Sequence, residues 1–272
     1  MGWAEYETRL RIAWRALLDS NPMECDVQSF LEKHPCLLPG VFNMGAKSGH
    51  YPYPDAVISQ PPLAAVGNRV PDFMCLSTNS LEFEPVLIEL ERPDRNWFTQ
   101  KGNPSAHLTQ AHNQLAQWRA WFAIPANVQV FYEEFQVPLM LRSRRLRVSC
   151  VLIYGRRREF EGNSRLNQVR AQLARDSEYL MTYDRLEPRA DAANLYTVRK
   201  QSDGYVAVAF PPTYVLRPGL ADRYLLVSAK AKAVDHSEWM SERRREFIKR
   251  RFPYWEDWAR TKGPKLAGSE VE

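Results

Sequence analysis

The chain has 272 residues, 44% of them hydrophobic and 25% charged, which is typical of a globular protein with one substantial core. Its 37 lysines and arginines exceed its 32 acids, and the net charge of +5 weakly favours a polyanionic partner. The sequence has no apolar secretion segment near its start and no run of about 18 apolar residues. We therefore expect a cytoplasmic protein without a membrane span. The four cysteines are too widely spaced for a zinc knuckle or a disulfide framework.

The first part of the chain predicts two helices and a long connection. Apolar residues recur at close to 3.6-residue spacing over residues 3–18, which predicts an amphipathic helix. A second helix is expected to start with Asp26 as its N-cap, to carry Glu32 and to end near Pro35. Residues 37–68 are rich in Gly and Pro and predict a long connection with one short strand. A connection of that length usually has a function.

The middle of the chain alternates strand and helix patterns. A helix over 105–123, with Ser105 at its start, has an apolar stripe at helical spacing, and a helix over 164–178 precedes a short strand at 179–183. The other predicted strands are 72–77, 84–91, 127–132 and 148–154. This order predicts an α/β sandwich with a mixed central sheet flanked by helices.

The last part of the chain has a weaker pattern. A hairpin is expected near 195–210, and a basic helix with an aromatic side lies within 237–262. Residues 263–272 are expected to be a disordered tail.

Three acids suggest a metal site. Asp72 opens one predicted strand, and Glu89 and Glu91 lie two apart in the next, so their side chains share a face roughly 7 Å apart. Two anions on one face of an apolar strand are costly unless a cation lies between them or water reaches them. Two alternatives remain open: Asp72 as a turn or cap residue, and Glu89 paired with an arginine such as Arg69 or Arg92.

Four segments carry a resemblance to a known family. They read Phe30–Pro35, Arg69–Phe73, Ile88–Pro93 and Thr182–Leu186, with a glutamine-bearing helix before the last. In this order they resemble the Shedu antiphage defence nucleases, whose catalytic domain belongs to the PD-(D/E)XK superfamily. The resemblance implies a restriction-endonuclease-like fold. The expected division is an N-terminal helix (1–24), a nuclease core (25–190), a C-terminal extension (191–262) and the tail (263–272).

The resemblance also implies a catalytic site. Asp72 and Glu89 would hold Mg²⁺ or Mn²⁺, which would polarise the scissile phosphate and lower the pKa of a bound water. Glu91 stands where the family pattern has a lysine, and it would act as a general base or bind a second metal ion. Three further residues are candidates for supporting roles: Gln114, which shares a helix face with Gln110 and His107, Glu32 as an extra metal ligand, and Lys101 as a migrated cation. A solvated helix face is the alternative for Glu32 and Gln114.

Arginine runs suggest how DNA would bind. Two runs, which include Arg144, Arg145, Arg156 and Arg157, bracket one predicted strand and would grip phosphates, or form a solvated rim. The basic C-terminal helix carries Arg243 and Arg244 together with aromatic rings, which suit either DNA or an oligomer interface. The family resemblance favours a homo-oligomer.

The primary hypothesis is a Mg²⁺-dependent DNA endonuclease of bacterial antiphage immunity. The alternative is a catalytically silent DNA-binding or sensing module with the same fold, because Glu91 replaces the usual lysine. A third interpretation is an oligomeric scaffold whose acids form salt bridges with Arg69, Arg92 and Arg95.

Overall fold

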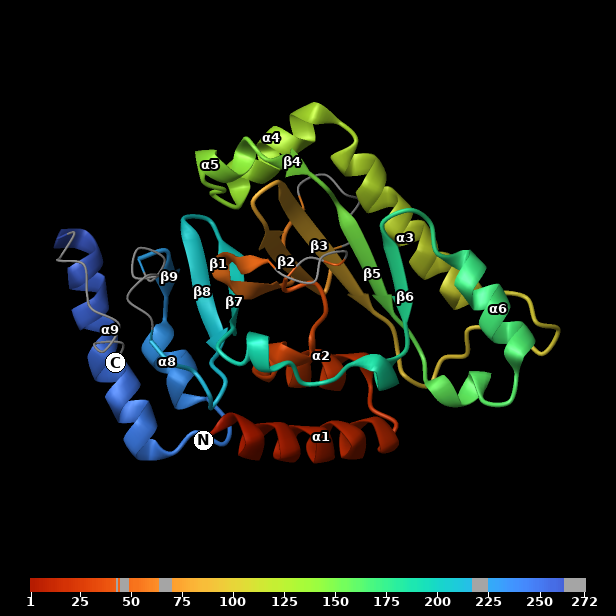
Figure 1. The fold of residues 1–272 in the computed structure, drawn as a ribbon, viewed down its shortest axis with the longest axis horizontal. Helices are drawn as coiled ribbons and strands as arrows, with labels where there is room; N and C mark the ends of the chain where they lie inside the picture. The colour runs from red at the N-terminus through yellow and green to blue at the C-terminus, as the bar shows by residue number, and fades with distance from the viewer. Residues whose placement is uncertain (43, 45–48, 64–69, 217–224, 262–272) are drawn as a thin grey trace.

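The computed structural model describes residues 1–42, 44, 49–63, 70–216 and 225–261. The described strands form one nine-stranded mixed sheet in the order β6-β5-β3-β2-β1-β7-β8-β9, and β4 pairs with β3 beside this path (Figure 1). The strands are β1 (His50–Ser59), β2 (Phe73–Thr78), β3 (Glu82–Leu90), β4 (Arg145–Leu146), β5 (Ser149–Ile153), β6 (Glu178–Met181), β7 (Tyr196–Gln201), β8 (Gly204–Ala209) and β9 (Val227–Ser228). A mixed α/β architecture with a central sheet is thus confirmed.

Helices cover both faces of this sheet. They are α1 (Trp3–Asp19), α2 (Glu24–Lys33), α3 (Ala106–Phe122), α4 (Pro125–Glu134), α5 (Leu139–Arg142), α6 (Ser164–Leu173), α8 (Lys230–Asp235) and α9 (Glu242–Thr261). Short 3-10 turns occur at η1 (Pro35–Leu37), η2 (Arg157–Phe160), η3 (Tyr183–Arg185) and η4 (Ala190–Ala192). No helix among the described residues combines the length and the hydrophobicity that crossing a bilayer requires.

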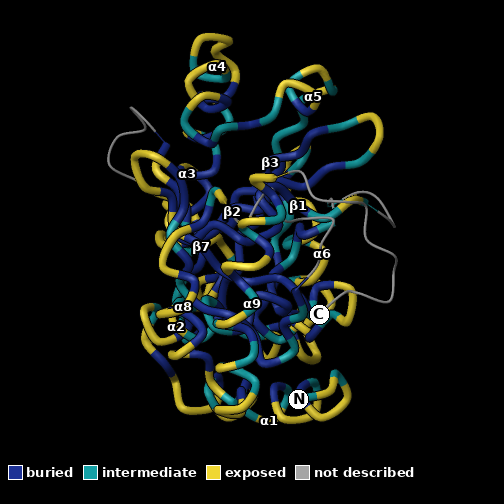
Figure 2. Tube along the Cα trace, turned by 90° about the vertical axis from the view of Figure 1, so that its left-hand side faces the viewer, coloured by how far each residue is buried: buried dark blue, intermediate teal, exposed yellow. Residues whose placement is uncertain are grey.

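Two apolar cores lie on opposite faces of the sheet. Helices α1 and α2 pack with Phe73 and Ile88 in one core, whereas Leu87 belongs to the other core together with Trp118 of α3. Neighbouring residues of β3 alternate between the cores because successive side chains of a strand point to opposite faces. Figure 2 shows the strands mostly buried, with exposed surface on the outer sides of α1, α4 and α5.

Several predicted boundaries are confirmed. Helix α3 begins after Ser105, whose hydroxyl accepts a hydrogen bond from the Leu108 amide at 3.2 Å, as expected of an N-cap. The hairpin near 195–210 is the β7–β8 pair. Strand β7 also pairs in parallel with β1, so the sheet continues past residue 190. The N-cap of α2 is Met23 rather than Asp26, whose carboxylate instead accepts from the Met23 amide at 3.0 Å.

One predicted strand was wrong, and one predicted connection contains a longer strand than expected. Residues 127–132 belong to α4, because Pro125 occupies the first helical turn and Phe131 packs against other rings rather than into a sheet. The long connection contains β1, whose last eight residues are all buried. Its prolines, Pro52 and Pro54, lie where the pairing with β2 shifts register, and such irregularities tolerate proline in a strand. Arg69 and the predicted tail lie outside the described residues.

Candidate functional site

The sheet topology gathers several chain ends at one edge. Strands β3, β5 and β6 are parallel, β1 runs in the same direction, and β2 runs in the opposite direction between β1 and β3. The carboxyl ends of these four strands therefore share an edge with the start of β2. Asp72, Glu89 and the segments after β5 and β6 all lie along this edge.

Asp72 and Glu89 are neighbours on adjacent strands. Phe73 pairs with Ile88 in the antiparallel register, so the next residues outward, Asp72 and Glu89, lie beside each other. The Asp72 carboxylate accepts a hydrogen bond from the Leu90 amide at 2.7 Å. Burial raises the pKa of Asp72 to about 7, against the lowering effect of the Leu90 amide and with a further increase from the charge of Glu24. A cation at this position would relieve the cost of ionising Asp72.

Glu89 and Tyr183 complete the neighbourhood of Asp72. Glu89 is 8% exposed, near the end of β3. Burial raises the pKa of Tyr183, and the nearby charges of Asp72, Glu24 and Glu89 raise it further. The Tyr183 hydroxyl donates to the carbonyl oxygen of Glu91 at 2.6 Å, which is a structural role.

Glu24, the first residue of α2, is an acid of this site that sequence reasoning missed. Burial raises its pKa, while Arg95 and Arg92 lower it. It has a sequence signal: Glu24, Gln28 and Glu32 are spaced by four residues and share one helix face. The Gln28 amide donates to the carbonyl oxygen of Asp72 at 3.3 Å, which links this face to the start of β2.

Glu91 forms an ion pair with Arg95, four residues later. Their side chains are 13% and 28% exposed, so the pair is screened only in part by water. Arg92, one of the alternative partners considered for Glu89, forms an ion pair with Asp94 at 2.5 Å. The cation beside Glu91 is Arg95, on the segment that follows β3.

Glu32 binds other groups than those predicted. Its carboxylate accepts from the Ser59 hydroxyl at 2.5 Å and pairs with Arg199 at 2.9 Å. Within the part of the chain that the structure describes, no three His, Cys, Asp or Glu side chains form a ready-made metal cluster. Asp72, Glu89 and Glu32 thus do not converge as a three-acid set, because Arg199 and Ser59 satisfy Glu32.

The predicted helix face of α3 is divided. Gln114 is 8% exposed, whereas Gln110 and His107, one and two turns nearer the start of α3, are exposed. Of these three residues, Gln114 is therefore the one whose side chain is buried within the fold. Lys101 is exposed in the turn before α3, and the described contacts do not connect it with Asp72 or Glu89.

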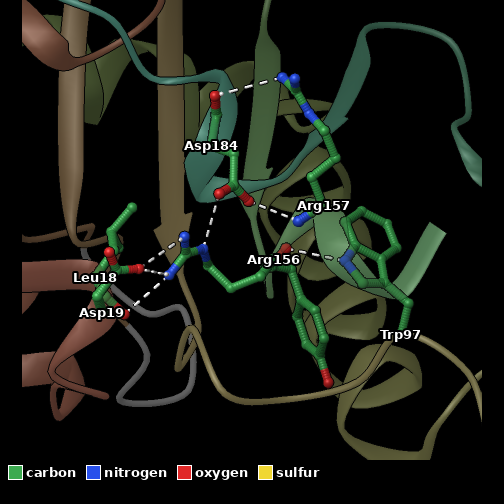
Figure 3. A network of polar contacts seen from close by, with 7 residues as sticks. Leu18, Asp19, Trp97, Arg156, Arg157 and Asp184 are labelled. Atoms are coloured by element: carbon green, nitrogen blue, oxygen red, sulfur yellow. Dashed lines mark hydrogen bonds and ion pairs between the residues drawn. The ribbon is translucent and has the colours of Figure 1, made fainter. Parts of the chain in front are cut away.

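The two arginine runs lie at opposite ends of β5. Arg144 donates to the carbonyl oxygen of Asn79, and the Arg145 amide to that of Leu81, at the β2–β3 turn away from the acids. Arg156 and Arg157 follow β5 at the acidic edge. Figure 3 shows that the Arg156 guanidinium is held by Asp184 at 2.9 Å and by the Leu18 carbonyl, whereas the Arg157 amide donates to Asp184 at 2.6 Å.

The basic C-terminal helix is α9, at the far end of the sheet from the acids (Figure 1). Its aromatic side is buried in part, because Phe252 and Trp255 lie in the chain's own core, whereas Tyr254 is 47% exposed. Arg243 is exposed, and Arg244 donates to the carbonyl oxygen of Tyr214 at 2.9 Å. The oligomer stays a prediction.

These features define a mixed α/β protein with a partly buried acidic site at one edge of its sheet. Residues 21–186, more than half of the chain, match the family described as Shedu protein SduA, C-terminal. The chain belongs to this family. No curated protein and no solved structure matches it.

Proposed function

We propose that the chain is a metal-dependent DNA endonuclease of the PD-(D/E)XK type that acts in bacterial antiphage defence. Membership of the Shedu family supports the defence role. The observation that carries the enzymatic part is the neighbouring pair Asp72 and Glu89, with burial raising the pKa of Asp72 to about 7. A buried acid with a raised pKa in a cleft or edge site is a frequent mark of function.

The donor set fits Mg²⁺ or Mn²⁺. These ions bind through one or two carboxylates, with water and substrate phosphate completing the coordination. Asp72 and Glu89 would hold the ion, and the Leu90 amide fixes the orientation of the Asp72 carboxylate. When bound, the ion would polarise the scissile phosphate and make a bound water more acidic. Glu24 adds negative charge beside Asp72 and so favours the cation further.

Arg95 takes over the electrostatic part of the missing lysine's role in this proposal. Its guanidinium lies beside Glu91 and lowers the pKa of both Glu24 and Tyr183. An arginine stays charged at all relevant pH values, so Arg95 offsets negative charge but does not transfer a proton. Proton transfer from the attacking water would then fall to Glu91, with Gln114 in a supporting role.

The test is cleavage of plasmid and linear DNA with Mg²⁺ or Mn²⁺. We expect the native chain to cut, and Asp72→Ala and Glu89→Ala to lose at least about 100-fold in rate, because each removes half of the carboxylate pair. Asp203→Ala is the matched control, since Asp203 is an exposed acid in the β7–β8 turn. Circular dichroism must show that each variant is folded. Equal rates for the Asp72 and Asp203 variants would refute the proposal.

The second candidate is a silent DNA-binding or sensing module. Two observations favour it: Glu91 is paired with Arg95, and the described residues contain no three-ligand metal cluster. A silent module would bind DNA without cutting it in any metal and would show no millimolar-range affinity for Mn²⁺. Comparing Mn²⁺ binding of the native chain with Glu89→Gln separates the two functions.

A further inference from the structure

An arginine pocket lies on the acidic edge of the sheet, beside the proposed catalytic acids. It is a cavity of about 310 Å³ between η2, α6 and the end of β6. We define the arginine pocket by its polar lining residues, which are Arg157, Glu161, Asn167, Arg170, Thr182 and Arg185. Thr182 precedes Tyr183, whose hydroxyl binds the backbone after β3. The pocket and the acids therefore lie along the same sheet edge, the pocket at the end of β6 and the acids at β3 and β2, with β5 between β6 and β3.

Three guanidinium groups from three separate elements meet in this pocket. Arg157 comes from η2, Arg170 from α6 and Arg185 from η3. Burial lowers the pKa of Arg170, and the positive charges of Arg185 and Arg157 lower it further. The lining contains one acid, Glu161, against these three arginines, so its side chains carry net positive charge. Like charges brought together in this way favour an anionic ligand.

Arg170 and Arg185 of this pocket differ from Arg157, whose guanidinium donates to the Asp184 carbonyl oxygen at 3.4 Å, and from their neighbour Arg156. Asp184 and the Leu18 carbonyl occupy the Arg156 guanidinium (Figure 3). The guanidinium groups of Arg170 and Arg185, by contrast, make no hydrogen bond or ion pair with another residue in the described ranges. Arg170 is nevertheless held in place, because its guanidinium stacks on the Phe160 ring at 4.4 Å. A stacked guanidinium keeps its edge free to donate hydrogen bonds.

We propose that the arginine pocket binds a phosphate group of the nucleic-acid substrate. This rests on the proposed function and places the strand across the ends of β6, β5 and β3, towards Asp72 and Glu89. A guanidinium donates two parallel hydrogen bonds to phosphate, and three of them around one cavity suit a tetrahedral oxyanion better than a planar carboxylate. The bound group is either a phosphodiester within a strand or a phosphate at a strand end.

The test measures binding in EDTA, so that it does not depend on cleavage or metal. Fluorescence polarisation compares the native chain with the double variant Arg170→Gln, Arg185→Gln on oligonucleotides that do or do not carry a 5′-phosphate or a 3′-phosphate. The control is Arg9→Gln, Lys232→Gln, which removes two exposed cations on α1 and α8, outside the arginine runs and the basic helix, and gives the same net charge. A second variant, Arg170→Lys with Arg185→Lys, keeps the charge if the glutamine variant fails to fold.

We expect the glutamine double variant to weaken binding by about tenfold or more, and the lysine variant to weaken it less. The slope of log affinity against log salt concentration should decrease in magnitude by about one to two, which corresponds to the loss of one to two phosphate contacts. The affinity of the control should stay within about twofold of native, because its substitutions remove no phosphate contact in the pocket. If the variant loses only the preference for a phosphorylated end, the source is a terminal phosphate; a uniform loss on all oligonucleotides indicates an internal phosphodiester.

Two results would overturn the inference: the glutamine double variant binds every oligonucleotide like the native chain, or the control weakens binding equally. Failure of the proposed function looks different, because DNA is then uncut although binding still depends on Arg170 and Arg185. Conversely, unchanged binding by a folded variant of a chain that cuts DNA would refute the pocket alone.

Discussion

Replacing Asp72 by Asn should change the pH dependence of stability in a defined direction. The Asp72 carboxyl has its pKa raised from 3.8 to about 7 by burial. A raised pKa in the folded state means that this group stabilises the fold fully below the unfolded pKa near 4, and that the contribution is lost as pH rises through about 7. The full shift corresponds to about 4 kcal/mol, and water reaching the partly buried side chain reduces the expected effect to about 2 kcal/mol.

Asp72→Asn removes the ionisation but keeps an oxygen that can accept from the Leu90 amide. In metal-free buffer the variant should therefore match the native chain near pH 3.5 and exceed its free energy of unfolding by about 2 kcal/mol at pH 8.5. Urea unfolding at several pH values measures this, with Asp203→Asn as the exposed control. Adding Mn²⁺ at pH 8 should stabilise only the chains that retain Asp72. Parallel stability curves for the native chain and Asp72→Asn would refute the reasoning.

Three more predictions concern the surroundings of the same site. Glu24→Gln should lower the pKa of Asp72, because the Glu24 charge raises it; the pH at which native stability falls should then move down, and an unchanged profile would contradict the coupling. Arg95→Ala should tighten Mn²⁺ binding several-fold and slow cleavage, because it removes the cation beside Glu91; calorimetry and a rate assay on one sample show whether the two effects have opposite signs. Gly155→Ala should destabilise the fold by about 2–4 kcal/mol, since φ is +57° and an added Cβ would lie 2.6 Å from the Arg95 carbonyl oxygen; urea unfolding with an unchanged midpoint would exclude the clash.

The sequence predicted those elements whose local signals agree with their packing. Helix α3 has a cap at Ser105 and an apolar stripe that is buried in the fold, so its local and global requirements coincide. Strand β1 is longer than the short strand expected in residues 37–68, because its prolines and polar residues resemble a loop, while its pairing with β2 and β7 involves residues far away in sequence. Residues 127–132 have strand-like composition, and the helix there depends on packing around Phe131 that no local pattern contains.

Strand periodicity and spacing predicted that Asp72 and Glu89 are neighbours, but not the rest of the candidate site. Asp72 and Glu89 lie on one hairpin, so a spacing of 17 residues was enough to bring them together. Glu24 was missed because its position depends on how α2 packs across the start of β2, and Glu32, eight residues later on the same face, was chosen instead. The ion pair of Glu91 with Arg95 depends on the bend after β3, which strand periodicity does not describe.

The placement of Arg95 bears on the choice between an active nuclease and a silent module. The segment that carries it is fixed on both sides: Glu159 accepts from the amides of Trp97 and Phe98 at 2.8 and 2.9 Å, and the Trp97 indole donates to the Tyr154 carbonyl at 2.9 Å. Gly155 packs against the Arg95 carbonyl, so no side chain fits there. Arg95 thus offsets negative charge beside partly buried acids, which would cost free energy without a positive partner. In an active nuclease this charge replaces the lysine's, whereas in a silent module the ion pair only neutralises Glu91. Arg95→Ala therefore separates the two functions, because only an active site has cleavage to lose.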